Sequence, residues 1–137
     1  PIVAGSAMHQ PSTARLLKAD QLRGVCAETA ASPISELNNE VIKFTTEYKK
    51  RFATAPDAFA LAQYDGMNMV IAALKSGAKT AIEVRNWLAT NTFKGLAMSY
   101  KSDGKGNMAH DATIVCYDGK TRIPKIIKRY LNVDGVF

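Results

Sequence analysis

Residues 55–74 read APDAFALAQYDGMNMVIAAL, and this stretch decides the fold. Asp57 follows Pro56 at the position of an N-cap, and Gly77 ends the apolar run, which predicts a helix from Asp57 to Ser76. The helix has no continuous polar face, and a helix that is apolar all round must be covered by other parts of a protein. A chain of 137 residues has few other elements to cover it. The sequence therefore predicts a piece of a larger protein.

A second helix is predicted before this stretch. Ser32 and Pro33 have the cap-then-proline arrangement that opens a helix. Its apolar side chains recur every three or four residues and form one face, at Leu37, Val41, Phe44, Tyr48 and Phe52. The short connection over residues 53–56 predicts that the two helices pack as an antiparallel pair.

A third helix is predicted after Gly77. Thr80 and Glu83 form a T-x-x-E capping box, in which each side chain bonds the backbone N–H of the other residue. The helix ends near Thr90, and its inward stripe consists of Val84, Trp87 and Leu88.

Strands are predicted on both sides of the helical region. Residues 1–4 and 22–30 have the composition of strands, with a short helix over residues 11–18 between them. Beyond residue 95 the apolar period changes to two, which predicts strands over residues 96–100, 112–117 and 120–130. Residues 102–107 predict a hairpin turn rather than a calcium or phosphate loop. The fold class is therefore α/β, one domain at most, with the element order β-α-β-α-α-α-β-β-β.

Composition and charge exclude few functions. The chain is 47% hydrophobic and 22% charged, as in an ordinary globular protein, and its longest apolar run is too short to span a membrane. The net charge of +6 comes from basic residues spread along the chain, which favours a solvated surface over a nucleic-acid site. The sequence begins without a methionine or a basic leader, so we expect any targeting peptide to have been removed or to lie upstream.

The two cysteines, Cys26 and Cys116, each lie in an apolar, strand-like run with no metal-ligand spacing. A pair of buried free thiols is the favoured interpretation. A disulfide is the alternative if the compartment is oxidising.

Catalytic chemistry has little support in the sequence. His9 and His110 are expected to be exposed loop histidines, with no nucleophile or paired carboxylate at useful spacing. No metal site, no cofactor and no enzymatic activity are predicted. Asp65 lies in the middle of the apolar helix, and a structural hydrogen bond is the preferred role for its carboxylate over a ligand contact.

Three groups of segments carry a resemblance to a known family. They are Tyr48-Lys49-Lys50-Arg51-Phe52 with Pro56 and Tyr64-Asp65-Gly66, then the capped helix over residues 80–90 with Phe93-Lys94-Gly95, then Asp103-Gly104-Lys105-Gly106-Asn107 with Tyr117-Asp118-Gly119-Lys120. In this order and spacing they resemble the C-terminal portion of periplasmic solute-binding proteins of ABC transporters, the leucine and branched-chain amino-acid-binding family. The resemblance covers nearly the whole chain.

The resemblance implies a fragment of a two-lobe, type I periplasmic-binding fold, in which ligand is trapped as the lobes close about a hinge. Residues 1–30 and 112–137 would be second-lobe elements, and residues 31–111 first-lobe helices and a crossing segment. The long apolar helix would pack on first-lobe strands that this sequence lacks. Uncovered sheet edges and helix faces then predict that the fragment self-associates.

The resemblance also implies ligand-binding residues. The loop from Gly5 through Ser6, Ala7 and Met8 corresponds to the loop where amino-acid-binding members place an acidic residue against the ligand's ammonium group. Ala7 stands at that position, which leaves room for a carboxylate ligand without an amine, such as an aromatic acid. Phe59 matches a position where the family places an aromatic side chain against the ligand, and core packing is an equal alternative for it. Tyr64 is a second candidate ligand contact, for which core packing is the preferred role.

The function implied is that of an extracytoplasmic, periplasmic solute-binding subunit, which captures a small amino acid or an aromatic or carboxylic acid between its lobes. Its partners would be that ligand and the membrane subunits of an ABC importer, with no nucleic acid. A ligand-sensing or amide-sensing regulator with the same fold is one alternative, and a basic nucleic-acid-binding module is another.

Overall fold

The computed structural model describes residues 2–133, so that Pro1 of the first predicted strand and residues 134–137 of the predicted second-lobe range lie outside the described residues. Its elements are β1 (Ile2–Ala4), η1 (Ser6–His9), α1 (Pro11–Ala14), η2 (Asp20–Leu22), β2 (Val25–Thr29), α2 (Asn39–Phe52), α3 (Ala58–Lys75), α4 (Ala81–Thr90), β3 (Phe93–Lys94), β4 (Ser99–Ser102), β5 (Met108–Cys116) and β6 (Lys125–Val133). The predicted α/β class is confirmed. The predicted order lacks the short strand β3 and the two 3-10 turns.

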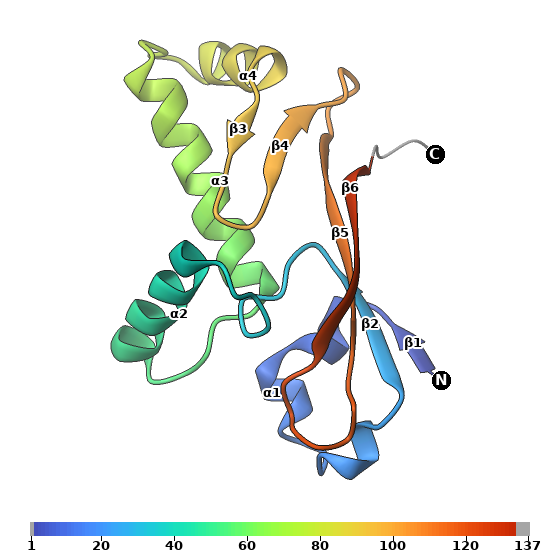
Figure 1. The fold of residues 1–137 in the computed structure, drawn as a ribbon. Helices are drawn as coiled ribbons and strands as arrows, with labels where there is room; N and C mark the ends of the chain where they lie inside the picture. The colour runs from blue at the N-terminus through green and yellow to red at the C-terminus, as the bar shows by residue number, and fades with distance from the viewer. Residues whose placement is uncertain (1, 134–137) are drawn as a thin grey trace.

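The sheet has the strand order β1-β2-β5-β4-β3, and β6 also pairs with β5 (Figure 1). β1 and β2 are parallel, whereas every other pairing of the described strands is antiparallel. β5 is shared between two groups of strands, because Met108 and Ala109 pair with β4 and residues 113–116 pair with β2. Within the sheet, β5 therefore connects the helical part of the molecule with the part built around β1 and β2.

Two separate hydrophobic cores form among the described residues, with no buried residue in common. The first core lies under α2, α3 and β4, with its buried residues Ala31, Val41, Leu61, Met98 and Tyr100. The second core lies between η1, α1, β2 and the end of β5, with its buried residues Ala14, Leu22, Val25 and Tyr117. The segment over residues 30–38, called the connector below, joins β2 to α2 and runs between these cores (Figure 1).

Local signals place two helices correctly. The Asp57 carboxylate accepts a hydrogen bond from the Ala60 N–H at 2.8 Å, and α3 runs to Lys75 as the apolar stretch predicts. The capping box of Thr80 and Glu83 is present at the start of α4, which ends at Thr90. The predicted inward stripe of α4 is half-buried at Val84, Trp87 and Leu88.

The predicted start of α2 is wrong. The helix begins at Asn39, and Asn38 is its N-cap, with its side chain accepting from the Glu40 N–H at 2.8 Å. Ser32 does not open the helix, because its hydroxyl bonds the buried His9 ring at 2.6 Å. Leu37 therefore lies outside the helix and is 86% exposed, rather than on the apolar face.

α3 carries the exposed apolar face that the sequence predicts. Six large side chains of this helix are at least about a third exposed: Phe59, Tyr64, Met67, Val70, Ile71 and Leu74. Only four of its residues are buried among those the structure describes: Ala58, Leu61, Asp65 and Ala73. One side of the helix packs on the first core, and the other side is open.

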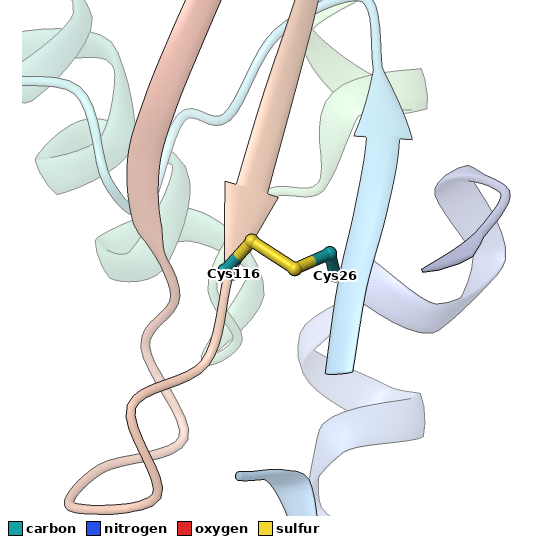
Figure 2. The surroundings of a disulfide bond; sticks show 2 residues. All are labelled: Cys26 and Cys116. Atoms are coloured by element: carbon teal, nitrogen blue, oxygen red, sulfur yellow. A yellow bond between two sulfur atoms is a disulfide. The ribbon is translucent and has the colours of Figure 1, made fainter. Parts of the chain in front are cut away.

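The two cysteines are bonded to each other, so the favoured interpretation as free thiols is wrong (Figure 2). Cys26 on β2 and Cys116 on β5 are direct partners in the antiparallel register, with their Cα atoms 4.0 Å apart. The ladder between the strands brings the thiols together although 90 residues separate them in sequence. The alternative left open by the sequence, a disulfide, is the one the structure has.

Candidate functional site

The candidate site lies where the loop after β1 meets the start of α3, between the two cores. His9 ends η1, and Asp57 caps α3. Asp57 is close enough for its charge to act on the His9 ring, which places η1 beside the first turn of α3 (Figure 1). Elements that belong to different cores thus meet at one point.

The predicted loop Ser6–Met8 forms η1, and its three residues face different surroundings. The Ser6 hydroxyl donates to the Glu28 carbonyl at 3.0 Å, which fixes the start of the loop to β2. Ala7 is exposed. Met8 packs against the second core, and its carbonyl accepts from the Tyr117 hydroxyl at 3.3 Å. Of these three, Ala7 presents its side chain to solvent most openly.

The structure separates the two aromatic residues of the prediction. Phe59, in the first turn of α3, is 53% exposed and belongs to the open apolar face of that helix. Tyr64 lies on the side of α3 that meets α2, where its ring centroid is 4.9 Å from that of Phe44. It lines a groove of about 860 Å³ between the two helices, together with Phe44, Tyr48 and Phe52. Phe59 therefore lies at the start of α3 on its open face, whereas Tyr64 lies with the aromatic side chains of α2.

The prediction for His9 is wrong. This residue is fully buried, not an exposed loop histidine, and its Nε2 lies 2.6 Å from the Ser32 hydroxyl. Burial lowers the pKa of His9 to about 4, and the Asp57 charge opposes that shift only in part. His9 is neutral at pH 7 and joins η1 to the connector. A histidine five residues after a strand gives no sequence signal for this role.

His110 is also misplaced by the sequence analysis. It is half-buried within β5 rather than in a loop, and its Nδ1 lies 2.9 Å from the Asp111 carbonyl. The predicted strand starts four residues too late, because the alternation is weaker before Ala112.

The burial of neutral His9 predicts a loss of stability in mild acid. Its pKa of about 4 in the folded chain lies below the ordinary histidine value of 6.5, so protonation favours unfolding. The free energy of unfolding is highest above pH 6.5, where His9 is neutral in both the folded and the unfolded chain. As the pH falls from 6.5 toward 4, the shift in the His9 pKa lowers this free energy by about 3 kcal/mol, at about 1.4 kcal/mol per pKa unit. Urea unfolding between pH 7 and pH 4.5 measures it.

Two variants test this assignment. His9→Gln is expected to flatten the dependence of unfolding free energy on pH over that range, whereas His110→Gln is expected to keep it. Equal slopes for the parent chain and His9→Gln would show that another group causes the acid sensitivity.

Asp65 has the structural role that the sequence analysis preferred. Its carboxylate is 1% exposed and accepts hydrogen bonds from the Leu96 N–H at 2.8 Å, the Ala97 N–H at 3.0 Å and the Tyr100 hydroxyl at 3.0 Å. Burial and the nearby Asp65 charge raise the pKa of Tyr100, so the hydroxyl stays a donor. Asp65 ties α3 to the turn that follows β3.

The hairpin turn after β4 is confirmed as a turn. The Asp103 carboxylate accepts from the Lys105 N–H at 2.7 Å and the Asn107 N–H at 3.0 Å. The hydrogen bond from the Asn107 side chain, followed by these two backbone bonds, holds the pKa of Asp103 below its usual value. The carboxylate thus serves its own turn.

No cluster of three or more His, Cys, Asp or Glu side chains in residues 2–133 is arranged to hold a metal ion. None of the helices in this range is long and apolar enough to cross a membrane.

Solved structures match the fold, whereas no protein-family description and no curated protein matches the sequence. A branched-chain amino acid ABC transporter periplasmic ligand-binding protein from Burkholderia xenovorans matches with a TM-score of 0.78 and 12% identity, over 88% of this chain and 34% of that protein. The branched-chain amino acid transporter substrate-binding protein of Streptococcus pneumoniae, in complex with isoleucine, matches with a TM-score of 0.71 and 24% identity. The match covers 93% of this chain and 37% of that protein. A solute-binding protein of an ABC transporter from Rhodopseudomonas palustris, in complex with 3,4-dihydroxybenzoic acid, matches with a TM-score of 0.70 and 19% identity. The match covers 84% of this chain and 33% of that protein.

These matches give the fold of the chain. It is part of the type I periplasmic-binding fold seen in solute-binding proteins of ABC transporters, as the resemblance implied. The chain spans about a third of the length of the solved structures it matches.

Proposed function

We propose that the chain is part of an extracytoplasmic solute-binding subunit, which captures a small amino acid or an aromatic or carboxylic acid and delivers it to an ABC importer. The observation that carries this proposal is the meeting of η1 and the first turn of α3 between two separate cores. A ligand between two bodies can draw them together and be enclosed by both. No catalytic group is required for this function.

The two cores support a division into lobes. The first core corresponds to the proposed first-lobe range, residues 31–111, and the second core to residues 1–30 and 112–137. We propose that the exposed face of α3 packs on first-lobe strands outside this sequence. In the isolated chain, the same uncovered face would drive self-association.

Ala7 and Phe59 favour a ligand with an apolar or aromatic body. Phe59 offers an exposed ring in the first turn of α3, and Ala7 offers no charge for an ammonium group. Among the matched structures, one holds isoleucine and another holds 3,4-dihydroxybenzoic acid. An aromatic or other carboxylic acid without an amine suits Ala7 better than an α-amino acid does.

The disulfide supports an extracytoplasmic, periplasmic location. Disulfides persist in oxidising compartments such as the bacterial periplasm and are rare in the cytosol. The bond between Cys26 and Cys116 therefore favours a transport protein over a cytoplasmic regulator with the same fold. The importing partners would be the membrane subunits of an ABC transporter.

Thermal unfolding of the complete gene product that contains this sequence tests the proposed function. A ligand at 100 times its dissociation constant stabilises a folded protein by about 2.7 kcal/mol, which raises the melting temperature by several degrees. We expect such a rise with one member of a panel that includes benzoate, 3,4-dihydroxybenzoate, leucine and isoleucine. No rise with any amino or aromatic acid would contradict solute capture.

The role of Ala7 is tested by a gain of specificity in the same gene product. Ala7→Glu supplies a carboxylate for the ligand's ammonium group, and a charge-assisted bond of about 1.5–3 kcal/mol corresponds to roughly 10- to 100-fold tighter binding of α-amino acids. Binding of amine-free acids is expected to weaken. Leu16→Glu adds the same charge at an exposed site and should change neither. Calorimetric titration compares them, and equal effects of the two variants would place Ala7 outside the site.

A further inference from the structure

The connector is tied to both cores by side chains. On the first-core side, Ala31 is buried in that core and the Thr45 hydroxyl donates to the Pro33 carbonyl at 3.4 Å. On the second-core side, the Ser35 hydroxyl donates to the Pro124 carbonyl at 2.6 Å, just before β6. Figure 1 shows the segment between β2 and α2 dipping beside the lower end of β6. The connector is thus held between the two bodies.

The last tie on the second-core side is an ion pair. Arg129 Nη2 on β6 lies 2.5 Å from Glu36 Oε2 on the connector, and the two residues are 93 positions apart. Arg129 is opposite Thr113 in the ladder with β5, at the level where β5 pairs with β2. The side chains are 33% and 22% exposed, so water and salt can reach the pair. Its strength therefore depends on solution conditions.

Both links between the cores are interrupted close to this pair. Directly after Glu36, Leu37 is 86% exposed, and α2 starts at Asn39. In β5, the register with β6 shifts between His110 and Ala112, between the part paired with β4 and the part paired with β2. Bulges of this kind locally break a ladder and bend the strand. These two places are where the bodies can turn with little loss of packing.

We infer that the Glu36–Arg129 ion pair is a latch that fixes the angle between the two cores. While the pair is formed, the connector is bound to β6 up to Glu36, and rotation about residues 37–38 and the β5 bulge is restricted. When the pair opens, the hydroxyl bonds of Ser32 and Ser35 still hold the rest of the connector to the second core. The two bodies then vary in angle without unfolding.

Distance measurement between two spin labels, one on each body, tests the latch in the complete gene product that contains this sequence, called the parent chain in this test. Labels at Leu16→Cys and Arg85→Cys are both on exposed positions, one beside the second core and one on α4, and the native disulfide stays oxidised. The parent chain is expected to give one narrow distance distribution, and Arg129→Met and Glu36→Gln are expected to broaden it and shift its mean. The angle is measured without ligand, so the outcome is independent of whether the protein binds a solute.

The chain offers a matched control in the second ion pair of the described residues. Lys125 Nζ, at the start of β6, lies 3.1 Å from Asp118 Oδ2 in the loop between β5 and β6. Lys125→Met therefore removes a cation from the same strand as Arg129, and neither member of this pair belongs to the connector. It should leave the distribution narrow. The charge swap Glu36→Arg with Arg129→Glu should restore the narrow distribution of the parent. In 1 M NaCl, where the screening length is about 3 Å, the distribution of the parent should broaden and that of Arg129→Met should not change. If Arg129→Met is folded by circular dichroism and its distribution matches that of the parent, there is no latch.

Discussion

Replacing Asp65 by alanine is expected to lower the free energy of unfolding by about 4 kcal/mol. The carboxylate is 1% exposed and is the acceptor for the Leu96 N–H, the Ala97 N–H and the Tyr100 hydroxyl. Each donor left without a partner in a buried place costs about 1–3 kcal/mol, and no water can replace the lost oxygens unless the site opens. Urea unfolding of the oxidised chain measures the loss.

The matched control for this variant is Asp103→Ala. That carboxylate also accepts backbone hydrogen bonds, but it does so within its own exposed turn, so the expected loss is below about 1 kcal/mol. If Asp65→Ala were no more destabilising than Asp103→Ala, the three bonds would not hold α3 to the sheet.

Gly95 gives an independent check on Asp65. A methyl group on Gly95 would lie 2.6 Å from Asp65 Cγ and 2.8 Å from Tyr100 Cε2, so the carboxylate occupies the space that a larger residue needs. Gly95→Ala should therefore destabilise the parent strongly and the Asp65→Ala variant less. A coupling within the usual range of about 0.5–3 kcal/mol in the double-mutant cycle would show this, whereas additive losses would contradict the contact.

Removing the disulfide by Cys26→Ser with Cys116→Ser is expected to lower the free energy of unfolding by on the order of 4 kcal/mol. The bond closes a loop with a sequence separation of 90 residues, and such a constraint removes much of the freedom of the unfolded chain. Chemical unfolding of the parent and the double variant under oxidising conditions measures the loss.

A reductant supplies the control for the disulfide variant. Dithiothreitol should destabilise the parent by a similar amount and should leave the double variant unchanged. A thiol assay on the unfolded, unreduced parent should find no free cysteine. Two free thiols would show that the cysteines are unpaired in the purified chain.

Sequence reasoning succeeded where the deciding interactions are local. The Asp57 cap and the box of Thr80 and Glu83 each join residues three positions apart, so a short stretch of sequence is enough to predict where these helices begin. The open face of α3 was predictable as well, since an unbroken apolar run cannot all be covered by a short chain. The three helices and the α/β class follow from signals of this kind.

The rest depends on contacts between distant parts of the chain. α2 starts at Asn39 rather than near Ser32 because the serine is engaged with His9 and Glu36 is engaged with Arg129. The burial of His9 depends on its contact with Ser32 in the connector, 23 positions away, so its neighbours in sequence do not predict it. The pairing of Cys26 with Cys116 requires the strand register, which no spacing rule supplies. Among the predicted site residues, Phe59 and Ala7 are placed at the junction, and their contact with a ligand stays a prediction.

The division into two cores also has a consequence for the order of folding during synthesis. The first core uses residues 30–108, so it can assemble before the rest of β5 and β6 leave the ribosome. The second core needs Tyr117 against Ala14, Leu22 and Val25, so its N-terminal part must wait for nearly the whole chain. Such long-range closure is slow and leaves apolar surface uncovered in the meantime. Residues 2–25 are therefore translated well before their packing partner Tyr117, and they are the segment of the described residues for which a chaperone would have the longest opportunity.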